Sequence, residues 1–212
     1  MTTLSIRVGS THPSVNSLSK RILDIAGSLV GLTILGVVFV PIAIAIYLDN
    51  PGSILYAQKR CGLYGKPFTI RKFRTMIVNA EQLQSLVQNE ANGPIFKNRN
   101  DPRVTRLGRF LRRTSLDELP QFWNVLMGEM SLVGTRPPTL DEVGKYSKHH
   151  WQRLDVKPGI TGEWQVRGRS TVKDFEKVVQ LDLRYQRLWS FWYDLAIICQ
   201  TLYVVIREVG AC

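Results

Sequence analysis

The amino-acid sequence predicts a helix-rich α+β fold, in which one membrane helix near the N-terminus precedes a single folded domain. Three observations lead to this prediction. Residues 25–48 form an apolar run without a charged side chain, two short stretches alternate as strands do, and most other segments have helical spacing. The chain has 212 residues, which is enough for one ordinary domain with a hydrophobic core.

The apolar run reads IAGSLVGLTILGVVFVPIAIAIYL and is long enough to cross the hydrocarbon layer of a bilayer. Because all of its faces are apolar, a buried core helix is disfavoured. The run is too long for a signal peptide, and no small-residue cleavage site follows it. Pro41 lacks an N–H donor, so we expect the helix to kink or break there. At the entrance, a local ion pair of Asp24 with Lys20 or Arg21 would lower the cost of a carboxylate at the interface.

Basic residues flank the apolar run on both sides. Lys20 and Arg21 precede it, and a second group follows it: Lys59, Arg60, Lys66, Arg71, Lys72 and Arg74. Because positive charge favours the cytoplasmic side, both ends are expected there. We therefore expect a re-entrant helix that enters the bilayer, bends at Pro41 and returns to the same face. A single crossing is the alternative.

This interpretation divides the chain into three parts. Residues 1–19 are rich in Ser and Thr and predict a flexible tail, residues 20–50 the membrane-inserted helix, and residues 51–212 one further domain. In that domain we expect strands at 53–60 and 68–76, helices at 77–88, 104–113, 116–127, 139–152, 175–185 and 192–208, a polar loop at 89–103, an extended segment at 131–139 and an irregular one at 156–170.

The formal net charge of +11 implies an anionic partner such as nucleic acid, an acidic membrane surface or a phosphorylated substrate. Nucleic acid is disfavoured because the aromatic residues gather near the C-terminus and do not interleave with the arginines. Trp189, Phe191, Trp192 and Tyr193 instead predict an interfacial helix, with an ordinary packed helix as the alternative. The three scattered cysteines have no metal-ligand spacing and indicate a reducing compartment.

The candidate chemistry lies in residues 114–120, TSLDELP. Pro120 suits a first helical turn, which places Asp117 and Glu118 at a helix N-terminus. One alternative is purely structural, because Ser115 and Glu118 fit a capping box, and both acids then only suit the positive helix end.

Arginines lead directly to these acids. Arg103, Arg106, Arg109 and Arg113 form a stripe, of which the first two suit a solvated face or a membrane surface, while Arg112 is close enough to serve the acidic pair. Arg136 lies in a proline-fixed loop suited to bidentate phosphate binding. Residues 157–162 and 167–169 add cations and glycines, where backbone can approach a ligand closely. Acids that could hold Mg²⁺ among arginines that could hold a diphosphate predict phosphoryl transfer.

At these residues the chain resembles the bacterial sugar transferase family, the monotopic polyprenyl-phosphate phosphoglycosyl transferases. The resemblance covers everything after the tail, and its ordered motifs are specific. They are Lys20-Arg21-x-x-Asp24, Gln58-x-Arg60-x-Gly62, Lys72-Phe73-Arg74-Thr75-Met76, Asp101-Pro102-Arg103-x-Thr105, Gly108-Arg109, Ser115-Leu116-Asp117-Glu118-Leu119-Pro120-Gln121, Asn124-Val125-Leu126, Met130-Ser131-Leu132-Val133-Gly134, Arg136-Pro137 and Lys157-Pro158-Gly159-Ile160-Thr161-Gly162.

The resemblance implies a role for each motif. Asp117 would be the nucleophile that attacks the sugar-bearing phosphorus of a UDP-sugar, giving an aspartyl-phosphosugar and UMP, and Glu118 would bind Mg²⁺ with it. Polyprenyl phosphate would then take the sugar phosphate from the aspartate. The remaining substrate-binding residues would be Arg112, Arg136, Lys72, Arg74, Lys157, Arg60, Gly159, Thr161 and Arg169.

The resemblance also implies a setting. It predicts a catalytic domain with interfacial helices on the cytoplasmic face of the bacterial inner membrane, a bilayer and two substrates as partners, no nucleic acid, and a possible homodimer. It is strongest to members that start exopolysaccharide or capsule synthesis with glucose or galactose phosphate. Larger members carry an N-terminal multi-helix domain, and we expect this chain to be the catalytic module alone.

Two positions depart from the family pattern, because Val40 stands where many relatives have serine and Thr135 where a proline often precedes the arginine. Two other functions remain as alternatives. One is a glycosyl transferase that releases UDP, and the other is a non-catalytic scaffold on anionic lipid.

Overall fold

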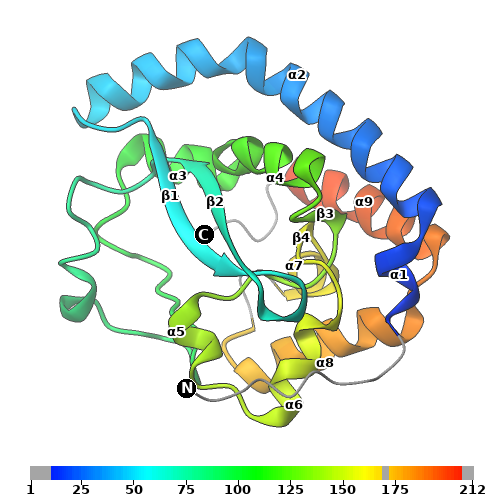
Figure 1. The fold of residues 1–212 in the computed structure, drawn as a ribbon. Helices are drawn as coiled ribbons and strands as arrows, with labels where there is room; N and C mark the ends of the chain where they lie inside the picture. Colours follow the sequence, from blue (N-terminus) through cyan, green and yellow to red (C-terminus); the bar gives the residue numbers. More distant parts are fainter. Residues whose placement is uncertain (1–10, 169–171, 207–212) are drawn as a thin grey trace.

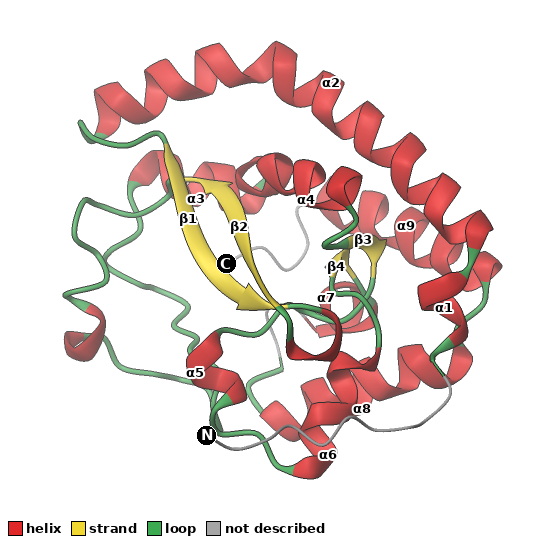
Figure 2. Ribbon diagram, viewed as in Figure 1, coloured by secondary structure: helices red, strands yellow, loops and turns green. Residues whose placement is uncertain are grey.

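A computed structural model describes residues 11–168 and 172–206 of the chain. Its dominant feature is the long helix α2, Leu18–Asp49, which arches over the rest of the molecule (Figure 1). Beneath the arch lie a two-stranded hairpin and a set of short helices, and two longer helices close the chain (Figure 2). The architecture is thus helix-rich with few strands, as the sequence predicts.

Within the segment predicted as a tail, the structure has a short helix and the start of α2. Helix α1, Pro13–Asn16, buries Ser14, and the ring of His12 accepts a hydrogen bond from the Ser14 N–H. Ser17 then caps α2, its hydroxyl accepting from the N–H of Lys20. This capping stabilises a helix start where only a flexible polar segment was expected. The first ten residues of the predicted tail lie outside the described residues.

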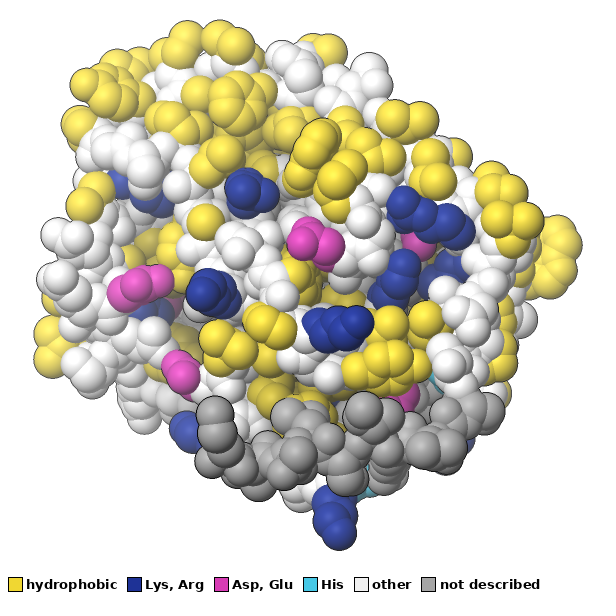
Figure 3. Space-filling model, in the orientation of Figure 1, with side chains coloured by type: hydrophobic (Ala, Val, Ile, Leu, Met, Phe, Trp, Pro, Cys, Tyr) yellow, Lys and Arg dark blue, Asp and Glu magenta, His cyan; other side chains and the backbone are white. Residues whose placement is uncertain are grey.

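Helix α2 is apolar, long and mostly uncovered. It has 32 residues, a length of about 48 Å at 1.5 Å per residue, and only 11% of its most apolar window is buried. Large apolar side chains such as Val37 and Leu48 are exposed along it, and apolar side chains line the corresponding edge of the surface (Figure 3). By length and composition it is the one helix of the described chain that could cross a membrane.

The helix continues through Pro41 without a break, and its curvature is gentle along the arch (Figure 1). Both of its ends contact the same domain. Near the start, Asp24 accepts hydrogen bonds from the hydroxyl of Ser131 and the N–H of Leu132, both at 2.8 Å, in place of the expected local ion pair. Near the end, Ile46 is buried in a cluster with Phe73 and Leu111.

The hairpin formed by β1, Leu55–Cys61, and β2, Pro67–Phe73, pairs antiparallel with Gln58 opposite Ile70. The alternation predicted this pair, although β2 ends at Phe73 and not at Met76. Phe68 and Ile70 are buried on one face of β2, and Lys72 lies farther along that same face, while Phe73 is buried on the opposite face.

The expected helix at 77–88 is wrong. The structure has turns there and only one short 3₁₀ helix, Gln84–Leu86. Asn79 has a positive φ of 64°, which stops a helix. The backbone is also committed elsewhere, because the N–H of Ile77 donates to the carbonyl of Arg103 and that of Val78 to Asn50.

The predicted helices at 104–113 and 116–127 form with altered bounds. Helix α3, Arg106–Arg113, is capped by the hydroxyl of Thr105. The second predicted helix divides into a 3₁₀ helix, η3 (Leu116–Gln121), and α4 (Phe122–Met127). In α2, Gly31 lies against the ring of Phe122, where an added Cβ would be 2.4 Å from the ring. The membrane helix is therefore packed closely on this layer.

The region from 131 to 168 is built from short elements. Strands β3, Ser131–Val133, and β4, Gly159–Thr161, pair in parallel and cross closely at Gly134 and Gly159. The helix expected at 139–152 is broken into α5, Leu140–Val143, and α6, Lys148–Trp151, followed by the 3₁₀ helix η4, Gln152–Asp155. Helix α7, Glu163–Gly168, lies in the segment expected to be irregular.

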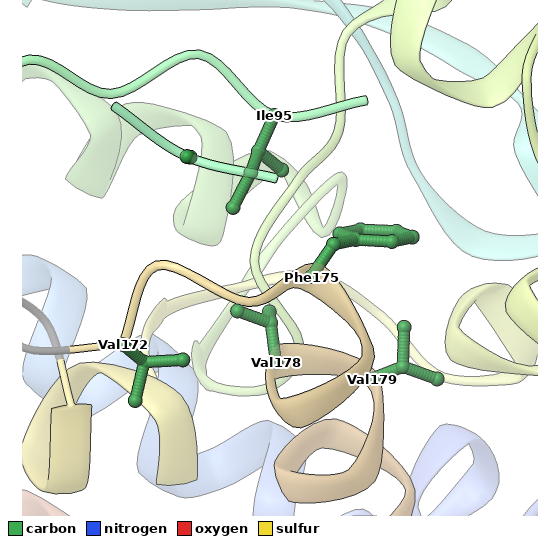
Figure 4. Close-up of a cluster of buried hydrophobic side chains, with 6 residues drawn as sticks. Ile95, Val172, Phe175, Val178 and Val179 are labelled. Carbon is green, nitrogen blue, oxygen red and sulfur yellow. The ribbon is translucent and has the colours of Figure 1, made fainter. Parts of the chain in front are cut away.

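The last two helices are α8, Phe175–Leu188, and α9, Phe191–Ile206. The first turns of α8 pack on the loop around Ile95, where Phe175, Val178 and Val179 are buried (Figure 4). Helix α9 has two faces. Asp194 and Ile197 are buried, while Trp192 and Leu202 are exposed. It is thus a packed helix that also presents an apolar face.

Candidate functional site

The acidic pair lies on η3, in a strained stretch of backbone. Ser115, two residues before Asp117, has a φ of 57°, which residues with a side chain rarely adopt. Its side chain makes no capping hydrogen bond, so the capping box with Glu118 does not form. Asp117 is 5% exposed, whereas the side chain of Glu118 is 23% exposed.

This short helix is wedged between the hairpin and the membrane helix. Leu116 packs in one apolar cluster with Phe73 of β2 and with Leu35 and Phe39 of α2. Asp117 is the next residue along the chain. The carboxylates therefore lie where the domain meets the only long apolar helix that the described chain contains.

Lys72 provides a cation that pairs with Glu118. Its ammonium lies 2.9 Å from a carboxylate oxygen of Glu118, and both side chains are about a quarter exposed. Lys72 shares one face of β2 with the buried Phe68 and Ile70, and its ammonium reaches Glu118 from that face. An ion pair of this exposure gains little stability, so its charges can also serve a phosphorylated ligand.

Arg60, Arg136 and Glu142 form a second group of charged side chains. The guanidinium of Arg136 donates to Glu142 at 2.9 Å and lies over the ring of Trp164. Arg60 donates to the carbonyl of Pro137 at 3.0 Å. Burial, aided by the charge of Arg136, lowers the pKa of Arg60 to about 10, while Glu142 and Glu118 act in the opposite direction. Arg60 thus lies within electrostatic reach of both Glu142 and the acidic pair.

Glu142 is a site residue that the sequence prediction missed. Burial acts to raise its pKa, but Arg136, Arg60 and hydrogen bonds outweigh burial, and the pKa lies below its ordinary value. Its carboxylate also caps α5 through the N–H of Thr139. The capping-box pattern Thr139-x-x-Glu142 is visible in the sequence and would have found the cap, although not the pairing with Arg136.

Gln121 is a second residue without an assigned role. It is 3% exposed at the end of η3, and its Nε2 has no hydrogen-bond partner among the described residues. Buried amide donors are normally satisfied. Its place in the same short helix as Asp117 makes it a candidate ligand for a substrate oxygen.

Three other predicted residues make contacts that the motifs did not indicate. Arg74 donates to the side chain of Asn50 at 2.8 Å and fixes the end of α2. Arg112 donates through Nε to the hydroxyl of Thr75 at 2.9 Å. Lys157 lies beside the first turns of α2, and Lys20, Arg21 and Asp24 are its charged neighbours. Each of the three has a structural setting that the motifs did not indicate.

Gly159 and Thr161 serve the crossing of β3 and β4. A Cβ on Gly159 would lie 2.1 Å from the backbone nitrogen of Gly134, so its glycine is required by this approach. The hydroxyl of Thr161 is 2.6 Å from that of Thr201 in α9. Arg169 lies outside the described residues.

The acidic pair also suits a magnesium ion. Asp117 and Glu118 offer adjacent oxygen ligands, and the described part of the chain holds no cluster of three or more potential metal-ligating acids, histidines or cysteines. Mg²⁺ is commonly held by one or two carboxylates, with waters and substrate phosphates completing its octahedron. The donor set therefore fits Mg²⁺ with a bound diphosphate better than a closed structural metal site.

Comparison with known proteins identifies this arrangement. Residues 15–208 match the family described as bacterial sugar transferase. The galactosyl transferase CpsE of Streptococcus agalactiae is 49% identical over 196 residues, covering 92% of this chain and 43% of the relative. The undecaprenyl-phosphate galactose phosphotransferase of Salmonella typhimurium is 42% identical over 200 residues, covering 91% and 41%.

One shorter relative matches over most of its own length as well. The uncharacterized sugar transferase EpsL of Bacillus subtilis is 37% identical over 191 residues, covering 90% of this chain and 89% of the relative. By contrast, the chain spans less than half the length of CpsE and of the Salmonella protein.

Proposed function

Because the chain belongs to the bacterial sugar transferase family, we propose that it transfers a hexose-1-phosphate from a UDP-sugar to polyprenyl phosphate, releasing UMP. One observation carries the proposal. Adjacent carboxylates on η3, with the ammonium of Lys72 2.9 Å from Glu118, lie directly beside a membrane-type helix. The names of relatives, which include undecaprenyl-phosphate galactose phosphotransferase, support this substrate class.

In the first step, a carboxylate oxygen of Asp117 attacks the phosphorus that bears the sugar. The bond from that phosphorus to the bridging oxygen breaks, and UMP leaves with this oxygen. The result is an aspartyl-phosphosugar. Splitting a difficult transfer into two displacements is the usual benefit of a covalent intermediate. The burial of Asp117 protects this acyl phosphate from water.

In the second step, an oxygen of polyprenyl phosphate attacks the same phosphorus, and the Asp117 carboxylate is the leaving group. The product is a sugar diphospholipid. Mg²⁺ held by Glu118 and Asp117 would neutralise charge on the diphosphate and on the transferred group. Lys72 and Arg60 supply further positive charge near Glu118, and Arg136 adds a planar guanidinium suited to phosphate.

We further propose that α2 lies in one leaflet of the bacterial inner membrane, with the catalytic domain on its cytoplasmic face. The support is that both ends of α2 contact the same domain while its outer face is apolar and exposed. Basic residues such as Arg21 and Arg71, near the two ends, favour the cytoplasmic side for both.

Nucleotide release tests the reaction. Protein in nanodiscs is given Mg²⁺, undecaprenyl phosphate, and either UDP-glucose or UDP-galactose. We expect UMP from at least one donor, and none from an Asp117→Asn variant. Asp141→Asn is the matched control, because Asp141 is an exposed acid on α5 and its loss is expected to leave the rate unchanged.

Other results would overturn the proposal. Release of UDP in place of UMP would show glycosyl transfer without the phosphate. No nucleotide from either donor, with a folded protein, would favour a non-catalytic membrane role. An Asp117→Asn variant that retains full activity would exclude Asp117 as the nucleophile.

A further inference from the structure

A cavity of about 270 Å³ lies under the first turns of α2, well away from the acidic pair. Residues 14–18 form one wall, and Lys20, Arg21, Asp24 and Lys157 provide its charged groups. Since a water molecule takes up about 30 Å³ in the liquid, the space holds a small polar group with several waters.

The cavity carries more positive than negative charge. Lys20 is balanced by Asp194, whose carboxylate is 2.7 Å away. Arg21 donates to the carbonyls of Val125 and Leu126, at 2.8 and 2.7 Å, and these groups carry no net charge. Asp24 is the only acid lining the cavity. Arg21 and Lys157 together therefore outweigh it by one charge.

Among the cations that line the cavity, Lys157 is the one without a bonding partner among the described residues. Its side chain is half-buried, and its ammonium has no hydrogen bond or ion pair with any described residue. Burial, followed by the charges of Arg21 and Lys20, lowers the pKa of Lys157, and Asp24 offsets this only in part. Since a half-buried cation among like charges is unfavourable, an anion in the cavity would stabilise this arrangement.

The position of the cavity separates it from the reaction. It adjoins residues 20–24 of α2, whereas Leu116 and its neighbours pack against Leu35 and Phe39. A separation of 11 to 19 residues along a helix is on the order of 20 Å. The phosphate that Asp117 would attack therefore cannot occupy this cavity at the same time.

The surroundings indicate where an anion would come from. Leu18 and Ile22 are exposed on the same turns of α2, with 73% and 59% of their surface accessible. On the right of the molecular face drawn in Figure 3, basic side chains are grouped around an acidic one, close to apolar side chains. A cationic cavity at the edge of an apolar surface matches the depth of lipid head groups.

We propose that this cavity binds a phosphate group carried by an anionic phospholipid, with Lys157 and Arg21 as its cationic ligands. The hydroxyl of Ser17 lines the same wall and can donate to the phosphate. Such a lipid would hold the start of α2 at the interface. The proposal does not depend on the transfer reaction, because it concerns binding alone.

Acylation of Lys157 tests the proposal on the unmodified protein. In detergent, the acetylation rate of each lysine is measured by mass spectrometry with added phosphatidylglycerol, phosphatidylcholine or inorganic phosphate. At a lipid concentration ten times the dissociation constant, phosphatidylglycerol is expected to slow acetylation of Lys157 about tenfold. The exposed Lys177 on α8 is the internal reference and should not change.

The three additions separate the sources of the anion. Protection by phosphatidylglycerol alone supports the proposal. Equal protection by inorganic phosphate would overturn the lipid as the source, although not the anion site. Equal protection by phosphatidylcholine would show simple coverage by lipid, and no protection by any addition would show that the cavity binds no phosphate. Either of these results would overturn the proposal.

Variants give a second, independent readout. Native mass spectrometry counts phosphatidylglycerol molecules retained by the wild type, Lys157→Gln, Lys157→Arg and Lys177→Gln. We expect one fewer retained lipid in Lys157→Gln, and wild-type retention in the other two. The Gln variants at 157 and 177 remove the same charge, so a general electrostatic effect would change both equally and overturn the assignment.

Discussion

The ammonium of Lys20 lies 2.7 Å from a carboxylate oxygen of Asp194, and both side chains are buried. The other oxygen of this carboxylate accepts a hydrogen bond from the hydroxyl of Tyr185 at 2.8 Å. The indole N–H of Trp189 donates to the first oxygen at 3.1 Å. One carboxylate thus joins the first turn of α2 to α8, α9 and the turn between them.

Breaking this pair should destabilise the protein strongly. Lys20→Met leaves the Asp194 carboxylate buried without its cation, and such losses typically cost about 3–5 kcal/mol of unfolding free energy. Chemical unfolding in detergent measures the change. Lys177→Met, an exposed lysine on α8, is the control and should unfold like the wild type. A Lys20→Met variant as stable as this control would show that the pair is not stabilising.

The packing of α2 on α4 can be tested with two glycines of one helix. Gly31→Ala places a Cβ 2.4 Å from the ring of Phe122, so the helices must separate, at a cost of about 1–3 kcal/mol. Gly36→Ala meets nothing within 4 Å and should stabilise the helix slightly through its better propensity. Melting temperatures in nanodiscs measure both changes. Equal melting temperatures would contradict this close contact.

The two ends of α2 should face the same aqueous compartment. Ser19→Cys and Ser53→Cys, both exposed positions, are introduced singly after the native cysteines are replaced by alanine. In inverted inner-membrane vesicles, an impermeant maleimide should label both cysteines. In intact spheroplasts it should label neither. Labelling of the two positions from opposite sides would establish a crossing helix and exclude the proposed one-leaflet arrangement.

Removal of divalent cations should abolish nucleotide release, and Mg²⁺ should restore it. Glu118→Gln keeps the shape of the side chain and removes one anionic ligand, so half-maximal activity should require more Mg²⁺. Titration of Mg²⁺ against the rate of UMP formation measures this. If EDTA does not affect the wild type, the metal is not part of the reaction.

Glu142 should contribute to stability at neutral pH and lose that contribution in acid. Its pKa lies below the ordinary value of 4.5 in the folded protein, so folding favours the ionised form. This contribution is fully present above the unfolded pKa and is lost as the pH falls through the folded pKa. Glu142→Gln should therefore destabilise the protein at pH 7 and flatten the acid side of its stability profile. The free energy of unfolding is measured from pH 3 to pH 7 for the wild type and for Glu142→Gln. Parallel profiles of the two proteins would contradict this expectation.

Local sequence patterns predicted much of the fold and the acidic site. Alternation identified β1 and β2, and an uncharged run identified α2. The adjacent acids Asp117 and Glu118 marked residues 114–120 as the candidate site. These features depend on neighbours within a few positions. The same patterns could not show that Ser115 adopts a left-handed conformation, and this conformation removes the expected capping box.

Long-range contacts explain what the sequence did not predict. The segment from Ile77 onwards has helical composition, but the N–H groups of Ile77 and Val78 bond to Arg103 and Asn50, and the positive φ of Asn79 stops a helix there. Lys157 lies in a glycine-containing motif that suggested substrate binding, yet the fold brings it next to Arg21. In both cases the deciding partners are far away in the sequence, where no periodicity signals them.

The pair between Lys20 and Asp194 also sets an order of events during synthesis, because the two residues are 174 positions apart. At 5–20 residues per second, the ribosome adds the second residue roughly 9–35 s after the first. Helix α2 is thus made well before α9, and its start can first be held only by the contacts of Asp24 with Ser131 and Leu132, to which α9 later adds the buried ion pair. A message truncated before residue 194 would produce a chain in which Asp24 still holds the start of α2, but in which Lys20 is left without its carboxylate partner.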